Sequence, residues 1–144
     1  MSLEAILKAI PHRPPFLFLD EIVAQNENRI VCRKRFTGEE AFYTGHYPGF
    51  PLTPGVILCE AAMQAGAVLL SQLVGDSGGV PVATRANDVR FKKMVRPGDT
   101  IELEVDLKER LANAFFMNAK VTCGGQVAVR LEFACTLAPR EGTA

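Results

Sequence analysis

The chain has 144 residues and a mass of 15.7 kDa, which is the size of one ordinary domain. Hydrophobic residues make up 48% and charged residues 22%, a composition that excludes a disordered chain. Sixteen basic residues balance sixteen acidic ones, so no global charge attracts nucleic acid or an anionic membrane. We expect a single domain over residues 1–144, with no nucleic-acid partner and no membrane partner.

Four cysteines are present, and they are Cys32, Cys59, Cys123 and Cys135. No pair has the CxxC spacing, and no histidine lies near any of them at the spacing of a metal ligand. Three of the four lie in apolar runs, where free cysteine behaves as a small hydrophobe. We therefore expect reduced cysteines, no metal, and a cytoplasmic location. The N-terminus lacks a basic stretch followed by an apolar run, so we expect no signal peptide.

The first quarter of the chain predicts one short helix and two strands. Residues 2–10 place apolar side chains on one helical face, with Ser2 as a possible N-terminal cap and Pro11 as the end. Apolar runs predict strands over Phe16–Val23 and Arg29–Phe36.

A long apolar helix follows in the middle of the chain. Thr53 at the cap and Pro54 at the first helical position predict its start, and Gly75 its end. The intervening residues are apolar on all sides, which predicts a helix buried on all sides. A transmembrane span is disfavoured because Glu60 and Gln64 fall inside the run. A single sheet can cover only part of such a helix, so we expect a second subunit to cover the rest.

The second half predicts an antiparallel meander of long strands. Apolar and polar residues alternate, which is typical of strands with one buried face, and Gly-Gly and Pro-Gly-Asp sequences predict the turns. An extended segment comes first, at Val80–Val95, then the turn at Pro97–Asp99, strands at Ile101–Lys108 and Phe115–Cys123, the hairpin at Gly124–Gly125, and a strand at Val127–Leu137. The expected fold class is α+β, with one helix wrapped by an antiparallel sheet.

Two residues point to acid–base chemistry. Glu60 is the only charged residue of the apolar helix, and a buried carboxylate needs a partner or a proton. His46 lies in the segment 45–55, of which six of eleven residues are Gly or Pro, so its loop is rigid. Free backbone N–H groups at the helix start, where Gly55 leaves room, could polarise a substrate carbonyl. Alternatively, Glu60 bridges or reaches solvent, and His46 only packs.

These residues resemble a known family. His46 in GHYPGFPLTPGV, followed fourteen residues later by Glu60 in CEAAMQ, is similar to the FabZ-type 3-hydroxyacyl-acyl-carrier-protein dehydratases. The segments at 11–20 and 90–99 are similar to the family as well, so the resemblance covers almost the whole chain. It implies a hotdog fold, in which a curved antiparallel sheet wraps a long central helix.

The resemblance also implies roles for individual residues. His46 matches the base that removes the proton α to the thioester carbonyl, and Glu60 matches the acid that protonates the departing hydroxyl. Gly55 matches the glycine whose N–H holds the thioester oxygen, and Gln64 a residue that orients the acid. The family reaction needs no cofactor. In the family the histidine and the acid of one site come from different protomers, so we expect a homodimer, or a trimer of dimers.

Further candidates are less specific. Tyr47, Phe50 and Phe91 could line an acyl tunnel, although aromatic residues near a core are more often part of it. His12 is expected to pack or to lie at the surface. A basic cluster could dock an acidic carrier protein, unless it is only a solvated strand end. The cluster comprises Arg90, Lys92, Lys93 and Arg96.

The sequence thus predicts dehydration of (3R)-3-hydroxyacyl-acyl-carrier-protein in fatty acid biosynthesis, with coenzyme A as the other possible carrier. Two alternatives stay open. A hotdog thioesterase would use Glu60 to activate water, and a non-catalytic acyl-binding protein would bind without turnover.

Overall fold

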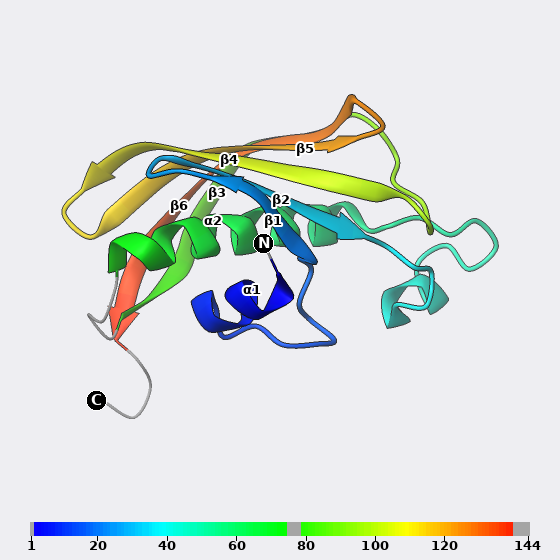
Figure 1. Ribbon diagram of the computed structural model, residues 1–144. Coiled ribbons are helices and arrows are strands. Elements are labelled where there is room, and N and C mark those ends of the chain that lie inside the picture. Colours follow the sequence, from blue (N-terminus) through cyan, green and yellow to red (C-terminus); the bar gives the residue numbers. More distant parts are fainter. Residues whose placement is uncertain (1, 75–78, 140–144) are drawn as a thin grey trace.

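The computed structural model, which describes residues 2–74 and 79–139, contains a curved six-stranded antiparallel sheet with a long helix along its concave face (Figure 1). The predicted α+β architecture, one helix wrapped by a sheet, is confirmed. In chain order the elements are α1 (Leu3–Ala9), β1 (Glu21–Gln25), β2 (Arg29–Arg35), the 3-10 helix η1 (Ala41–Thr44), α2 (Gly55–Val74), β3 (Gly79–Phe91), β4 (Thr100–Leu111), β5 (Ala114–Cys123) and β6 (Gln126–Pro139).

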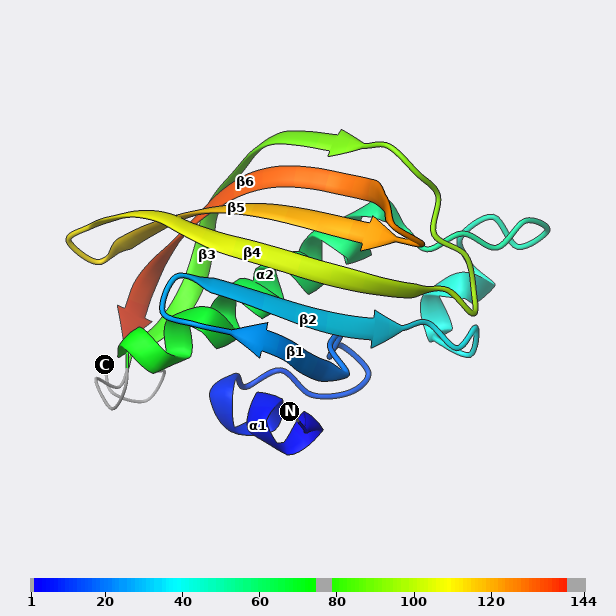
Figure 2. The same ribbon diagram turned by 45° about the horizontal axis from the view of Figure 1, so that its top comes forward.

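The sheet has the strand order β1-β2-β4-β5-β6-β3 (Figure 2). Strands β4, β5 and β6 form the predicted meander, and Gly124 and Gly125 turn the last hairpin with φ of 59° and 79°. The prediction of one continuous meander was wrong for β3, which pairs with β6 at the far edge. Helix α2 lies between β2 and β3 in the chain and runs beneath the sheet, so it carries the chain from the second strand, β2, to the opposite edge.

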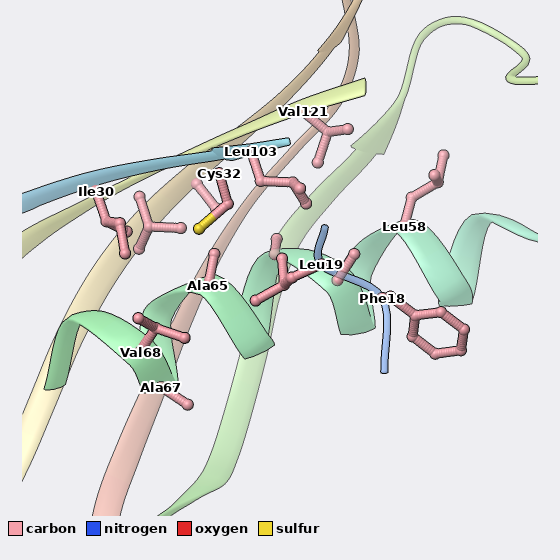
Figure 3. Close-up of a cluster of buried hydrophobic side chains, with 14 of the residues drawn as sticks. Phe18, Leu19, Ile30, Cys32, Leu58, Ala65, Ala67, Val68, Leu103 and Val121 are labelled. Carbon is pink, nitrogen blue, oxygen red and sulfur yellow. The ribbon is translucent and has the colours of Figure 1, made fainter. Parts of the chain in front are cut away.

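The core lies between α2 and the concave face of the sheet. Ile30, Cys32, Leu103 and Val121 point from the strands toward the helix, where Ala65 meets them (Figure 3). Small helical residues allow this close approach: a Cβ on Gly66 would lie 2.7 Å from Cζ of Phe133.

Three of the four cysteines belong to this core, as predicted, and Cys59 is only partly buried. Burial raises the pKa of the Cys32 thiol to about 12 and that of Cys135 to about 11. These thiols therefore stay neutral and act as small apolar side chains.

The strand predicted over Phe16–Val23 was wrong in its first half, because β1 begins only at Glu21. The side chain of Gln64 takes the place of a neighbouring strand. Its Oε1 accepts the backbone N–H of Phe18 at 2.8 Å, and its Nε2 donates to the carbonyl of Phe16 at 2.8 Å. At Phe16 and Phe18 the partner is therefore one buried amide on α2. Only at Asp20 does the segment reach β2, where its N–H donates to the Arg33 carbonyl at 2.8 Å.

Helix α2 is not covered on all sides within one chain. It is apolar and long enough to span a membrane, yet 56% of its most apolar window is buried inside the protein, which identifies it as the core helix. One stripe is incompletely covered: Val56 is exposed, and Cys59, Glu60 and Met63 are partly buried. Val56 is 72% exposed. The neighbouring β3 is an edge strand whose residues 82–88 are also exposed.

Replacing Gly66 with Ala should destabilise the protein. The added methyl group collides with the Phe133 ring, and overpacking of a core costs ~1–3 kcal/mol, against a helix-propensity gain of at most ~1 kcal/mol. We expect Gly66→Ala to lower the free energy of unfolding by ~1–2 kcal/mol in urea denaturation. The double variant Gly66→Ala/Phe133→Leu should be no less stable than Phe133→Leu alone. A fully additive loss would contradict this contact.

Candidate active site

His46 lies in a loop, residues 45–54, that projects from the body of the molecule between η1 and α2 (Figure 1). Its Nδ1 is 3.0 Å from the carbonyl oxygen of Leu52. A carbonyl only accepts, so Nδ1 carries the hydrogen and Nε2 keeps its lone pair. The Tyr47 ring meets the imidazole edge-on, with centroids 4.7 Å apart. The loop therefore holds the imidazole in the tautomer that a general base needs.

Both ends of the loop are anchored. The Tyr43 and Thr53 hydroxyls lie 2.5 Å apart and are buried, and the Thr53 N–H donates to the Val95 carbonyl at 2.8 Å. The Arg96 guanidinium lies over the Phe50 ring, 5.0 Å from its centroid, in a cation–π contact.

The predicted cap at Thr53 was wrong because its hydroxyl is engaged with Tyr43. The first helical bonds run instead from the N–H groups of Ile57 and Leu58 to the Pro54 carbonyl, at 2.9 and 3.3 Å. The helix consequently begins at Gly55.

A cavity of about 370 Å³ connects the histidine to the helix start, and its walls are mostly apolar. Among the described residues, the backbone N–H groups of Gly55 and Val56 donate to no protein acceptor. They lie at the positive end of the helix dipole. Phe91 packs so closely on Gly55 that a Cβ there would lie 2.5 Å from its ring. The cavity is lined by His46, Leu52, Thr53, Gly55, Val56, Leu58, Phe91, Lys93, Met94 and Val95.

The structure brings four of the predicted site residues to this cavity, namely His46, Gly55, Phe91 and Lys93. The side chains of Tyr47 and Phe50 are largely exposed and are not among its lining residues. Their tunnel role stays a prediction.

Glu60 lies in a different cavity, of about 240 Å³, between α2 and β3. Its Oε2 accepts a hydrogen bond from Nε2 of Gln64 at 3.0 Å, which is the contact that an orienting glutamine would make. Gln64 is only 1% exposed, and all its polar atoms are engaged. The cavity is lined by His12, Glu60, Met63, Gln64, Ala67, Pro81, Val82, Ala83 and Cys135.

Two further facts concern the acid. His46 and Glu60 line separate cavities, so a single chain does not bring the imidazole and the carboxylate together.

His12, which the sequence suggested only as a packing or surface residue, lies beside the acid instead, with Nε2 3.7 Å from Oε2 of Glu60. In the sequence His12 is marked only by its place between Pro11 and Arg13. A proline restricts the backbone but does not determine the direction of a neighbouring side chain.

The basic cluster is only partly free. Arg90 pairs with Asp88 at 2.9 Å, Nζ of Lys93 donates to the Cys123 carbonyl at 3.1 Å, and Arg96 covers Phe50. Lys92 is exposed and has no ion pair within the part of the chain that the structure describes. Over residues 2–74 and 79–139, no three His, Cys, Asp or Glu side chains are placed to hold a metal ion.

Comparison with known families shows which family the chain belongs to. Residues 10–132 match the FabA-like domain. The chain belongs to the FabA-like family. The matched residues begin directly after α1 and end midway along β6. They include every residue that lines the cavity of His46, and all but Cys135 of those that line the cavity of Glu60.

Relatives in the FabA-like family agree closely in length. The chain is 38% identical over 128 residues to the 3-hydroxyacyl-acyl-carrier-protein dehydratase FabZ of Clostridium perfringens, which covers 89% of this chain and 92% of that protein. It is 40% identical over 128 residues to the enzyme of the same name from Herpetosiphon aurantiacus, covering 88% and 91%. The predicted resemblance to FabZ-type dehydratases is confirmed.

Solved structures confirm the hotdog fold. The dehydratase heterocomplex ApeI:P from Xenorhabdus doucetiae aligns with a TM-score of 0.81 and 15% identity, over 94% of this chain and 91% of that one. The PaaI protein of Escherichia coli aligns with a TM-score of 0.66 and 14% identity, over 81% of each chain.

Replacing Gly55 with Ala tests why this FabA-like site has a glycine at the helix start. The added Cβ displaces the Phe91 ring, and it also blocks approach to the first N–H groups. We expect Gly55→Ala to abolish most of the turnover of 3-hydroxyacyl thioesters, measured as kcat/KM, and Gly55→Ala/Phe91→Ala not to restore it. Full recovery in the double variant would show that the glycine serves only to accommodate Phe91.

Proposed function

We propose that this chain is a hydro-lyase that converts (3R)-3-hydroxyacyl-acyl-carrier-protein to trans-2-enoyl-acyl-carrier-protein and water in fatty acid biosynthesis. The observation that carries the proposal is His46. Among the described residues its Nε2 has no hydrogen-bond partner, and the imidazole borders an apolar cavity that ends at helix N–H groups without a protein acceptor in that same part of the chain. The names of the curated relatives, at 38–40% identity over most of the chain, support the same reaction.

The chemistry follows from these groups. Nε2 of His46 removes the proton α to the thioester carbonyl, and negative charge develops on the carbonyl oxygen. The Gly55 N–H stabilises that charge, since one fixed donor is worth ~3–4 kcal/mol. A well-placed base adds ~10²–10⁴-fold. Glu60 then gives its proton to the leaving hydroxyl, which departs as water. The chain's own residues supply each of these steps.

We infer that the site is completed by a second subunit, with His46 of one protomer facing Glu60 of the other. Three features support this dimer. The two groups line separate cavities in one chain. On α2, Val56 is exposed and Met63 is only partly buried, and β3 beside them is an edge strand whose residues 82–88 are exposed. An unpaired edge of this length readily pairs with a second chain. A trimer of such dimers stays a prediction.

The carrier is proposed to dock beside the cavity of His46. Lys93 lines that cavity, and Lys92 and Arg90 are exposed next to it. Opposite charge steers an acidic carrier protein to such a surface. The location proposed is the cytoplasm, where four free thiols persist.

The proposed reaction is tested by mixing the purified protein with 3-hydroxyacyl thioesters on carrier protein and on coenzyme A. We expect enoyl thioester, followed at the absorbance of its conjugated double bond, and a loss of ~10²–10⁴-fold in kcat for His46→Ala. Free thiol release without enoyl formation would identify a thioesterase instead. Binding without either product would identify an acyl-binding protein, and full activity of His46→Ala would reject the mechanism.

A further inference from the structure

Two donors converge on one oxygen of Glu60. Nε2 of Gln64 is 3.0 Å from Oε2, and Nε2 of His12 is 3.7 Å from the same atom. Within residues 2–74 and 79–139, no group hydrogen-bonds the other oxygen, Oε1. We propose that His12 is a positioning residue for Glu60: with Gln64 it holds Oε2, so that Oε1 carries the proton delivered to the leaving hydroxyl. This proposal rests on the proposed dehydration.

Hydrogen bonds from the next residue fix the position of the His12 backbone. The neighbouring Arg13 guanidinium donates to the carbonyls of Leu7 and Ile10, each at 2.9 Å, and so satisfies the C-terminal end of α1. The same group donates to the carbonyl of His12 itself at 2.7 Å. The backbone of His12 is thereby tied to the end of α1, and its ring extends to the side of α2 that carries Glu60.

The ring is placed to present one nitrogen only. Nδ1 of His12 is inaccessible to solvent and has no hydrogen-bond partner among the described residues. Nδ1 is therefore unpaired in either tautomer, and only a hydrogen on Nε2 can be directed at an acceptor, Oε2 of Glu60. The neutral ring consequently carries its hydrogen on Nε2. Because Nδ1 does not reach water, the ring cannot pass a proton through to solvent, which leaves positioning as its role.

The distance fits a contact that tightens during the reaction. At 3.7 Å the His12–Glu60 approach is longer than a direct hydrogen bond, and catalytic contacts are often long before substrate binds. Both side chains are about a quarter exposed in the single chain, at 28% and 25%. The partner subunit and the substrate would exclude water here and strengthen the attraction.

A matched pair of variants tests the idea. His12→Leu keeps the bulk of the ring without a donor, and His12→Gln returns an N–H donor at a similar reach. We expect His12→Leu to lower kcat ~10–100-fold with little change in KM, because a misplaced acid slows only the chemical step, and His12→Gln to recover most of it. In the double variant His12→Leu/Glu60→Gln, the loss should equal that of Glu60→Gln alone.

Equal losses in the two His12 variants, or multiplicative losses in the double variant, would overturn the positioning role. Wild-type protein that forms no enoyl product would overturn the proposed function instead. The tautomer can then still be read without turnover, by ¹H–¹⁵N correlation spectra of the histidines. We expect the Nε2–H tautomer at His12 and a shift of its signals in Glu60→Gln. An Nδ1–H tautomer, or His12 chemical shifts that do not change in Glu60→Gln, would refute the proposal.

Discussion

The structure depends on a helix with more apolar surface than one sheet can cover. Burying apolar area is worth ~25 cal/mol per Å², so the 20-residue α2 draws the curved sheet around it. The sheet covers one side and leaves the stripe that carries Glu60 beside the free edge of β3. The part of α2 that the sheet leaves incompletely covered is the part that a second subunit would bury. Because Glu60 lies on this stripe, the acid lies where that subunit would pack.

The buried amide of Gln64 links this packing to the chemistry. A polar group at 1% exposure is tolerated only if its hydrogen-bonding capacity is used. Gln64 meets that condition because its Oε1 accepts from the Phe18 N–H, while its Nε2 donates both to the Phe16 carbonyl and to Glu60. The N-terminal segment and the acid are therefore fixed by one residue, and loss of either contact leaves a buried polar group unpaired.

Much of the fold could be predicted because its signals are local. The alternation along β4, the glycine pair after β5 and the apolar run of α2 each follow from periodicity or backbone freedom. The failures are non-local. Phe16–Phe18 has the composition of a strand, yet its partner is a side chain 46–48 residues away. Thr53 has the composition of a cap, yet its hydroxyl binds Tyr43.

In the site, too, local features could be predicted from the sequence and non-local ones could not. His46 and Glu60 stand out by their surroundings in the sequence, a rigid loop and an apolar helix. Their separation into two cavities, and the approach of His12 to the acid, depend on how α1, α2 and β3 pack, and no local pattern encodes that packing.

Mixing two inactive variants tests most directly whether each site is shared between subunits. After His46→Asn and Glu60→Gln proteins are unfolded together and refolded at equal concentrations, half of the dimers would contain one chain of each kind. A shared site gives each of these one intact centre, so the account predicts recovery of about a quarter of the wild-type dehydratase activity. No recovery, with mixed dimers demonstrated by mass spectrometry, would contradict it.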